Sequence, residues 1–242
     1  MKNKRLTILL ALCLGAFISV AAFGQDNSKE VLKKLQELDK MAQQTIDMQD
    51  IENLMNIRAL QIKGAVKPGD ADYRETVSRT AKDVCYGLDD KYLYGDAARK
   101  ALRGMDDPAF GKAGALKVPL VSTGHIQIAE DGQTAKGIYY SPGLQTEMGT
   151  DGKPKSAWDY KALGVDFILE DGKWRIWHLV AYTDFVTPPN ESWTEKTSTS
   201  NTNIKYKTLN PSTGTNSRLK TPSPYKTFSK TFSYCPAEGA GK

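Results

Sequence analysis

The chain has 242 residues, of which 40% are hydrophobic and 25% are charged, a composition typical of a globular protein that excludes wholesale disorder. The formal net charge of +5 is unevenly distributed, with +3 in residues 1–24, −4 in residues 25–194 and +6 in residues 195–242. The central part is mildly acidic, so we expect no nucleic-acid partner, which would need a basic face. Three cysteines are too few for a disulfide scaffold, and no Cys/His cluster has the spacing of a zinc site, so we expect no metal.

Residues 1–24 have the pattern of a secretory signal peptide. Lys2, Lys4 and Arg5 form a basic start, and an apolar run of 18 residues extends from Leu6 to Phe23. The pattern predicts cleavage after Gly24 and an exported protein, periplasmic or secreted. An uncleaved anchor is the alternative, but the run is only just long enough to span a bilayer, and we expect no stable membrane anchor.

The first half of the mature chain has mainly helical periodicity. Apolar residues recur at helical spacing between Val31 and Met55, and Gly64 and Pro68 end the run. Two short apolar stretches on either side of Asp89 and Asp90 are typical of a hairpin. The pattern predicts helices over residues 28–64, 71–81 and 96–103, strands over 83–86 and 91–94, and a loop over 105–119.

From residue 120 the periodicity changes to two. Alternating runs over residues 120–128 and 134–140 flank Asp131-Gly132, and runs over 163–170 and 174–185 flank Asp171-Gly172. An Asp-Gly pair between alternating runs indicates a hairpin, because Gly accepts the positive φ of a type I′ turn. Helices followed by a meander predict an α+β fold, a curved antiparallel sheet with helices covering one face.

Several sequence words strengthen this prediction. They are residues 50–55 (DIENLM), 130–137 (EDGQTAKG), 141–143 (SPG), 164–179 (GVDFILEDGKWRIWHL) and 221–225 (TPSPY). Because these words occur together and in this order, the chain resembles the SnoaL-like branch of the nuclear-transport-factor-2-like superfamily. The resemblance covers residues 45–193. It divides the mature chain into an N-terminal helical extension over residues 25–44, a SnoaL-like domain over 45–193 and a Ser/Thr/Pro-rich tail over 194–242.

The resemblance implies a cone-shaped sheet around an apolar pocket that binds a small apolar or cyclic ligand. Members include polyketide cyclases, dehydratases and ketosteroid-type isomerases, and also proteins without chemistry, so the fold does not decide the function. Family enzymes usually carry a Tyr and an Asp on the first helix and a His on the first long strand. Here residues 56–63 offer Arg58 and Lys63 but no carboxylate, and the strand His has no secure match.

Three functional hypotheses follow from the resemblance and this departure. A cofactor-free lyase or isomerase is the leading one, since no phosphate-binding loop or nucleophile elbow is present and no cofactor is expected. A non-catalytic small-molecule-binding protein or pseudoenzyme is the alternative, favoured by the missing Tyr and Asp. An assembly module acting through its outer sheet face is the third.

His178 is the predicted catalytic residue. A two-residue turn at Asp171-Gly172 places Val165 opposite His178, and opposed residues share a face of the sheet. We assign this face to the cone interior, where a neutral imidazole would suit a general base. The alternative is a core histidine held by a structural hydrogen bond.

Four further residues are predicted to bind the substrate. Tyr182 shares the face of His178, Tyr139 directs its hydroxyl into the pocket, and Trp158 forms the pocket rim. Plain core packing is the alternative for Tyr139 and Trp158. Arg58 either binds a substrate carboxylate as a fork or pairs with an acid such as Asp83.

Two further residues are predicted to support the site without contacting the ligand. The same register places Asp166 on the face opposite His178, and only a β-bulge would bring the two together as a His–Asp pair. His125 alternates with apolar Ile126 and Ile128, and we expect it to point away from the pocket, at the surface or at a dimer interface.

The outer sheet face and the tail leave alternatives open. Trp177, Leu179 and Phe185 make the outer face apolar, and we expect a homodimer to cover it. The tail, with 17 Ser and Thr among residues 194–242, is either disordered or, given its aromatic residues, docked on the domain. Cys85 and Cys235 either pair in an oxidising compartment or stay free.

Overall fold

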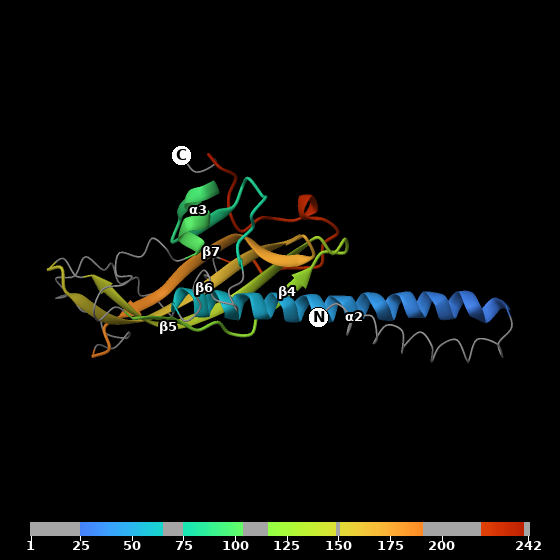
Figure 1. Cartoon of the computed structure of the whole chain (residues 1–242), viewed down its shortest axis with the longest axis horizontal. Helices are drawn as coiled ribbons and strands as arrows, with labels where there is room; N and C mark the ends of the chain where they lie inside the picture. The colour runs from blue at the N-terminus through green and yellow to red at the C-terminus, as the bar shows by residue number, and fades with distance from the viewer. Residues whose placement is uncertain (1–24, 65–74, 104–115, 149–150, 191–218, 240–242) are drawn as a thin grey trace. The chain divides into compact units, whose positions relative to one another are not determined.

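The computed structural model describes residues 25–64, 75–103, 116–148, 151–190 and 219–239 (Figure 1). The predicted signal peptide, most of the predicted 105–119 loop and the first part of the tail lie outside these residues. Internal contacts divide the chain into two units, residues 1–46 and 47–242. The second unit contains the sheet, and the site below belongs entirely to it.

The predicted first helix is confirmed as α2, which spans Gln25–Ile62. Up to residue 46 its large apolar side chains, such as Leu32, Leu38 and Met41, are exposed. In the second unit, Ile51, Leu54 and Met55 are buried at helical spacing, which gives α2 one apolar stripe. None of the described helices is long and apolar enough to cross a membrane.

Seven strands form one mixed sheet in the described residues, in the order β2-β1-β7-β6-β5-β3, with β4 also paired to β5. The predicted meander is confirmed as antiparallel β4-β5-β6-β7, and β1 adds to β7 in parallel. The bounds are β1 Cys85–Leu88, β2 Lys91–Tyr94, α3 Gly95–Leu102, β3 Lys117–Pro119, β4 His125–Ile128, β5 Thr134–Met148, β6 Pro154–Glu170 and β7 Lys173–Thr187.

Turn chemistry explains both tight hairpins. Asp171 and Gly172 take φ angles of 50° and 68° between β6 and β7, as a type I′ turn requires. Asp89 and Asp90 take 46° and 69° between β1 and β2. Asp tolerates this left-handed region better than most residues, so the two-residue turns set the register next to them.

The predicted helix over residues 71–81 is wrong in its described part. Val77 forms a parallel bridge with Ile176 of β7, and the Ser78 backbone N–H donates to the Ile176 carbonyl at 2.8 Å. The Glu170 carboxylate also holds the segment, by accepting hydrogen bonds from Ser78, Arg79 and Thr80. These pairings to β6 and β7 outweigh the local helical periodicity.

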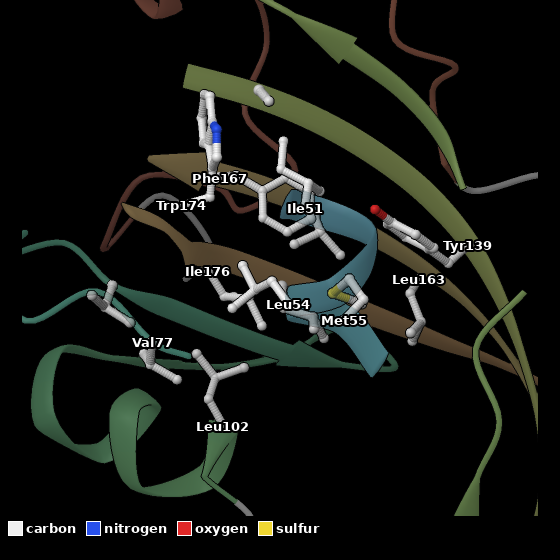
Figure 2. Packing of buried hydrophobic residues seen from close by; sticks show 14 of the residues in the cluster. Ile51, Leu54, Met55, Val77, Leu102, Tyr139, Leu163, Phe167, Trp174 and Ile176 are labelled. Atoms are coloured by element: carbon white, nitrogen blue, oxygen red, sulfur yellow. The ribbon is translucent and has the colours of Figure 1, made fainter. Parts of the chain in front are cut away.

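The two sheet faces have different covers. The helix face packs against the apolar stripe of α2 and forms the main core (Figure 2). It carries Tyr139, Leu163, Val165, Phe167, Trp174, Ile176, Leu179 and Ala181. This curved sheet with a helix on one face confirms the α+β fold class.

The opposite face, here called the tail face, carries Lys136, Gly164, Asp166, His178, Val180 and Tyr182. The C-terminal segment 219–239 covers part of it, so the docked alternative holds for this part of the tail. Tyr234 and Leu219 lie so close to Gly164 that an added Cβ would come within 2.5 Å and 2.7 Å of their side chains. Cys85 and Cys235 are joined by a disulfide.

Two residues that suggested an apolar outer face are covered within the chain. Leu179 lies on the helix face and is 1% exposed. The Trp177 ring contacts Phe228 of the C-terminal segment, with ring centroids 4.4 Å apart and the planes tilted by 43°. The homodimer therefore stays a prediction, but Trp177 and Leu179 no longer support it.

Candidate functional site

A β-bulge in β7 decides which face His178 occupies. Phe167 pairs with Ile176, but Asp166 pairs with His178, so Trp177 is an extra residue in β7. The extra residue shifts the register by one, so the side chains from His178 onward change face, as far as a second register shift between Tyr160 and Lys161 of β6. The predicted interior positions of His178 and Tyr182 are therefore wrong, and both lie on the tail face. The catalytic role of His178 stays a prediction, although it no longer points toward the cone interior.

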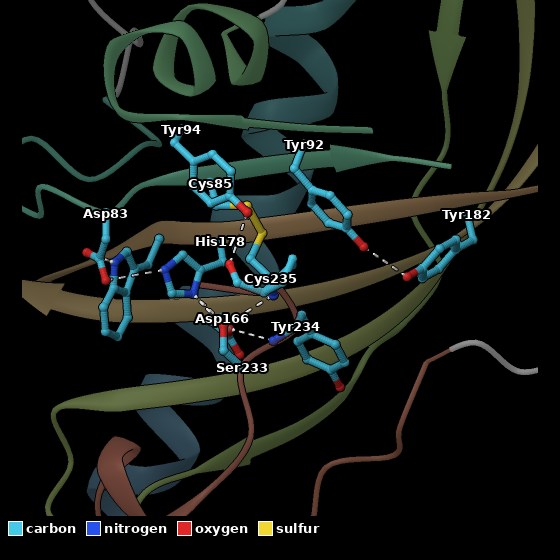
Figure 3. Close-up of a disulfide and its surroundings, with 12 residues drawn as sticks. Asp83, Cys85, Tyr92, Tyr94, Asp166, His178, Tyr182, Ser233, Tyr234 and Cys235 are labelled. Carbon is cyan, nitrogen blue, oxygen red and sulfur yellow. Dashed lines mark hydrogen bonds and ion pairs between the residues drawn. A yellow bond between two sulfur atoms is a disulfide. The ribbon is translucent and has the colours of Figure 1, made fainter. Parts of the chain in front are cut away.

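The same bulge creates the His–Asp pair that the regular register excluded. Nδ1 of His178 lies 2.9 Å from Oδ2 of Asp166 (Figure 3). Asp166 is fully buried, and its Oδ2 also accepts hydrogen bonds from the Ser233 hydroxyl and the Tyr234 backbone N–H, both at 3.1 Å. Two of these three donors come from the C-terminal segment, so the carboxylate fastens that segment to the sheet.

Lys136 completes the cluster from the neighbouring strand. Its Nζ lies 2.5 Å from Oδ1 of Asp166, and both side chains are 0% exposed. The rings of Phe232, Phe228 and Tyr234 lie 4.4, 4.6 and 5.3 Å from Nζ, at cation–π distance. Burial lowers the pKa of Lys136, while the charge of Asp166 and the hydrogen bond to it act in the opposite direction.

The other edge of His178 faces Asp83. Nε2 of His178 lies 3.9 Å from Oδ2 of Asp83, a side chain that is 66% exposed. The other carboxylate oxygen, Oδ1, accepts a hydrogen bond from Trp177 Nε1 at 2.8 Å. The imidazole is also stacked on Trp177, with ring centroids 4.4 Å apart. His178 is thus hydrogen-bonded through Nδ1 and packed on one ring face, while Nε2 lies beyond hydrogen-bond distance of Asp83.

On the helix face, one buried polar group without a hydrogen-bond partner among the described residues is the hydroxyl of Tyr139. Its ring is 0% exposed, and its hydroxyl finds no hydrogen-bond partner among the described residues (Figure 2). Burial, and to a smaller extent the negative charge of Glu52 on α2, raise the pKa of Tyr139, so the hydroxyl stays protonated. Glu52 itself accepts the Gly124 N–H at 2.8 Å. The helix face therefore places a carboxylate near a phenol.

Arg58 is the second such group. It follows Leu54 and Met55 by one turn on the same stripe of α2, and it is 9% exposed. Its Nε has no hydrogen-bond partner among the described residues, which include Asp83, the acid considered for it from the sequence. Burial lowers the pKa of Arg58, and the only other contribution comes from Tyr86 on β1. A buried guanidinium without a carboxylate is costly and calls for an anionic partner.

The remaining predicted residues lie away from both groups. Trp158, on β6, is 48% exposed on the tail face opposite Leu144 of β5. Tyr182 is half-buried beside Tyr92, with their hydroxyl oxygens 3.4 Å apart. His125 is exposed on β4, as expected. Within the described ranges, no three His, Cys, Asp or Glu side chains are grouped so as to hold a metal ion.

Sequence reasoning missed Lys136, Glu52 and Ser233. One signal was available for Lys136, because Asp166 interrupts an otherwise apolar run and a buried acid needs a cationic partner on a neighbouring strand. Glu52 lies in a sequence word quoted for the resemblance, yet its position relative to Tyr139 depends on how α2 crosses the sheet. Ser233 could not be found, since nothing in the tail fixes where it docks.

No family model matches the chain, and no curated protein matches it in sequence. Among solved structures, it is similar to hexachlorocyclohexane dehydrochlorinase LinA-type3 from Novosphingobium barchaimii, at 13% identity and a TM-score of 0.45, over 64% of this chain and 96% of that one. It is also similar to an NTF2-like protein with a cystatin-like fold from Novosphingobium aromaticivorans, at 17% identity and a TM-score of 0.39, over 66% and 92% of the two chains. Both identities are below 25% and both TM-scores are below 0.5, so these likenesses concern the fold alone and carry no argument about function.

Proposed function

We propose that this protein binds a small molecule with an apolar body and an anionic oxygen group, between α2 and the helix face of the sheet. The observation that supports this most is the buried Arg58 guanidinium, whose Nε has no partner among the described residues. A carboxylate on the ligand would satisfy it, because the planar guanidinium fork matches carboxylate geometry. The apolar side chains of Ile51, Leu54 and Met55 on the same stripe would contact the rest of the ligand.

An acid–base lyase or isomerase is the second candidate. It is favoured by Tyr139, a protonated buried phenol without a partner among the described residues, near the carboxylate of Glu52. In such a reaction Glu52 would remove a proton from the substrate, and Tyr139 would donate a hydrogen bond to the oxygen on which charge develops. This version of the predicted chemistry does not use His178.

One experiment tests both candidates. Ligands that co-purify with the mature protein are identified by untargeted mass spectrometry, and the protein is then incubated with them to look for turnover. We expect an anionic ligand that is lost from Arg58→Gln but kept by Arg103→Gln, whose guanidinium pairs with Glu75 elsewhere in the fold. A ligand retained equally by both variants would contradict the binding proposal. Turnover that disappears in Glu52→Gln and Tyr139→Phe would establish the enzyme.

We also propose that the protein is exported and forms a homodimer. The basic and apolar pattern of residues 1–24 supports export, as does the Cys85–Cys235 disulfide, since disulfides persist in oxidising compartments. Tyr140 and Trp158, which are 52% and 48% exposed on the tail face, support a dimer through this outer face.

A further inference from the structure

Lys136 and Asp166 are held in contact by the sheet itself. They occupy directly opposed positions of antiparallel β5 and β6, on the tail face. The Nζ–Oδ1 distance is 2.5 Å, and neither side chain is exposed. Because strand pairing fixes both backbones, the amine and the carboxyl group are positioned as in an intramolecular reaction, where proximity alone can give effective molarities of about 10⁵–10⁸ M.

The surroundings of the pair exclude water. Rings of the C-terminal segment, namely Tyr225, Phe228, Phe232 and Tyr234, lie between 4.4 and 5.9 Å from Lys136 Nζ. An ion pair in such an apolar enclosure is costly to maintain, because the desolvation of both charges offsets their attraction. A neutral amide at the same place would avoid this cost, and the water released by its formation would leave for the solvent.

The far oxygen of Asp166 is surrounded by hydrogen-bond donors. Oδ2 is within 3.1 Å of the Ser233 hydroxyl, the Tyr234 backbone N–H and Nδ1 of His178, whereas Oδ1 contacts Lys136. Attack of an amine on the carboxyl carbon would develop negative charge on Oδ2. Donors already placed at an oxygen that becomes an oxyanion lower the barrier to such an attack. The cluster thus supplies a nucleophile, an electrophile and an oxyanion site.

From this geometry we propose that Lys136 and Asp166 condense to an intramolecular isopeptide bond between β5 and β6. A proton passes from the ammonium group of Lys136 to Oδ1, and the neutral amine attacks Cγ. The tetrahedral intermediate holds its charge on Oδ2, next to Ser233, Tyr234 and His178. A second proton then moves from the nitrogen to Oδ1, the Cγ–Oδ1 bond breaks, and one water molecule leaves. No oxidant, reductant or activating reagent is needed.

Peptide mapping of the full-length protein tests this proposal. The purified protein is reduced, alkylated, denatured and digested, and the peptides are sequenced by tandem mass spectrometry. We expect the segments containing Lys136 and Asp166 to be joined, at a mass one water molecule below the sum of the separate peptides. Lys136→Arg is the matched control, because it keeps the positive charge beside Asp166 but carries no nucleophilic amine, and its two segments should separate.

The wild-type result alone decides the proposal if the control variant does not fold. Recovery of the Lys136 and Asp166 segments as separate, unmodified peptides from soluble wild-type protein would overturn it. A loss of water without the joined peptide would overturn it as well, since that would be cyclisation within the Asp166 segment.

Discussion

Replacing both cysteines of the disulfide with serine should lower the melting temperature of the protein by about 10–20 °C. Cys85 and Cys235 are 150 residues apart, so the bond closes a long loop of the chain. The chain-entropy model gives about 5 kcal/mol for a crosslink of this separation. In a domain of this size, each kcal/mol of lost stability lowers the melting temperature by about 2–4 °C. The loss is a large part of a typical free energy of unfolding of about 5–15 kcal/mol.

Scanning calorimetry of Cys85→Ser/Cys235→Ser beside the oxidised wild type measures this shift. Wild type kept reduced by an excess of thiol reagent should have the same stability as the double variant, which controls for effects of the serine hydroxyls. Amide hydrogen exchange over residues 219–239 should also accelerate in the variant, because the segment loses its covalent attachment. An unchanged melting temperature together with unchanged exchange would refute the view that this segment belongs to the folded domain.

Three further outcomes are expected. The donors from residues 78–80 outweigh burial and hold the pKa of Glu170 at about 2, below its ordinary 4.5, so the stability it provides is complete above pH 4.5 and is lost as the pH falls from 4.5 to 2. Acid titration of Glu170→Gln, followed by circular dichroism, should be flatter over that window, and a curve parallel to wild type would contradict this. Gly164→Ala should cost about 1–3 kcal/mol in urea unfolding, since its Cβ would meet the side chains of Tyr234 and Leu219, whereas a neutral result would mean that the segment yields freely. Light scattering should give a dimer for wild type and a monomer for Trp158→Glu, and a wild-type monomer would exclude the proposed dimer.

The sequence predicted the fold well where local chemistry decides it. The Asp171-Gly172 turn set the register of β6 and β7 correctly from Glu170 and Lys173 to Phe167 and Ile176. The helical stripe of α2 and the order of the elements also followed from periodicity. These features depend on neighbours in the sequence, and the resemblance to a known superfamily added only the way in which they assemble.

The candidate site was predicted less well, for a reason that lies in one residue. The extra residue Trp177 in β7 has no sequence mark that separates it from a regular strand residue, yet it moves His178 and Tyr182 to the other face. Its cause is tertiary, since its ring contacts Phe228 and its indole N–H donates to Asp83. A bulge was considered as the way to form the pair with Asp166, but the pattern alone could not select it.

The enclosure of Lys136 has a consequence for how this protein is made. The four rings that the described residues place around its Nζ come from positions after 224, so a nascent chain that has left the ribosome as far as the end of β7 still exposes Lys136, Asp166 and the thiol of Cys85. Synthesis runs from the N-terminus, and the sheet therefore cannot close this face until residues 219–239 have been synthesised.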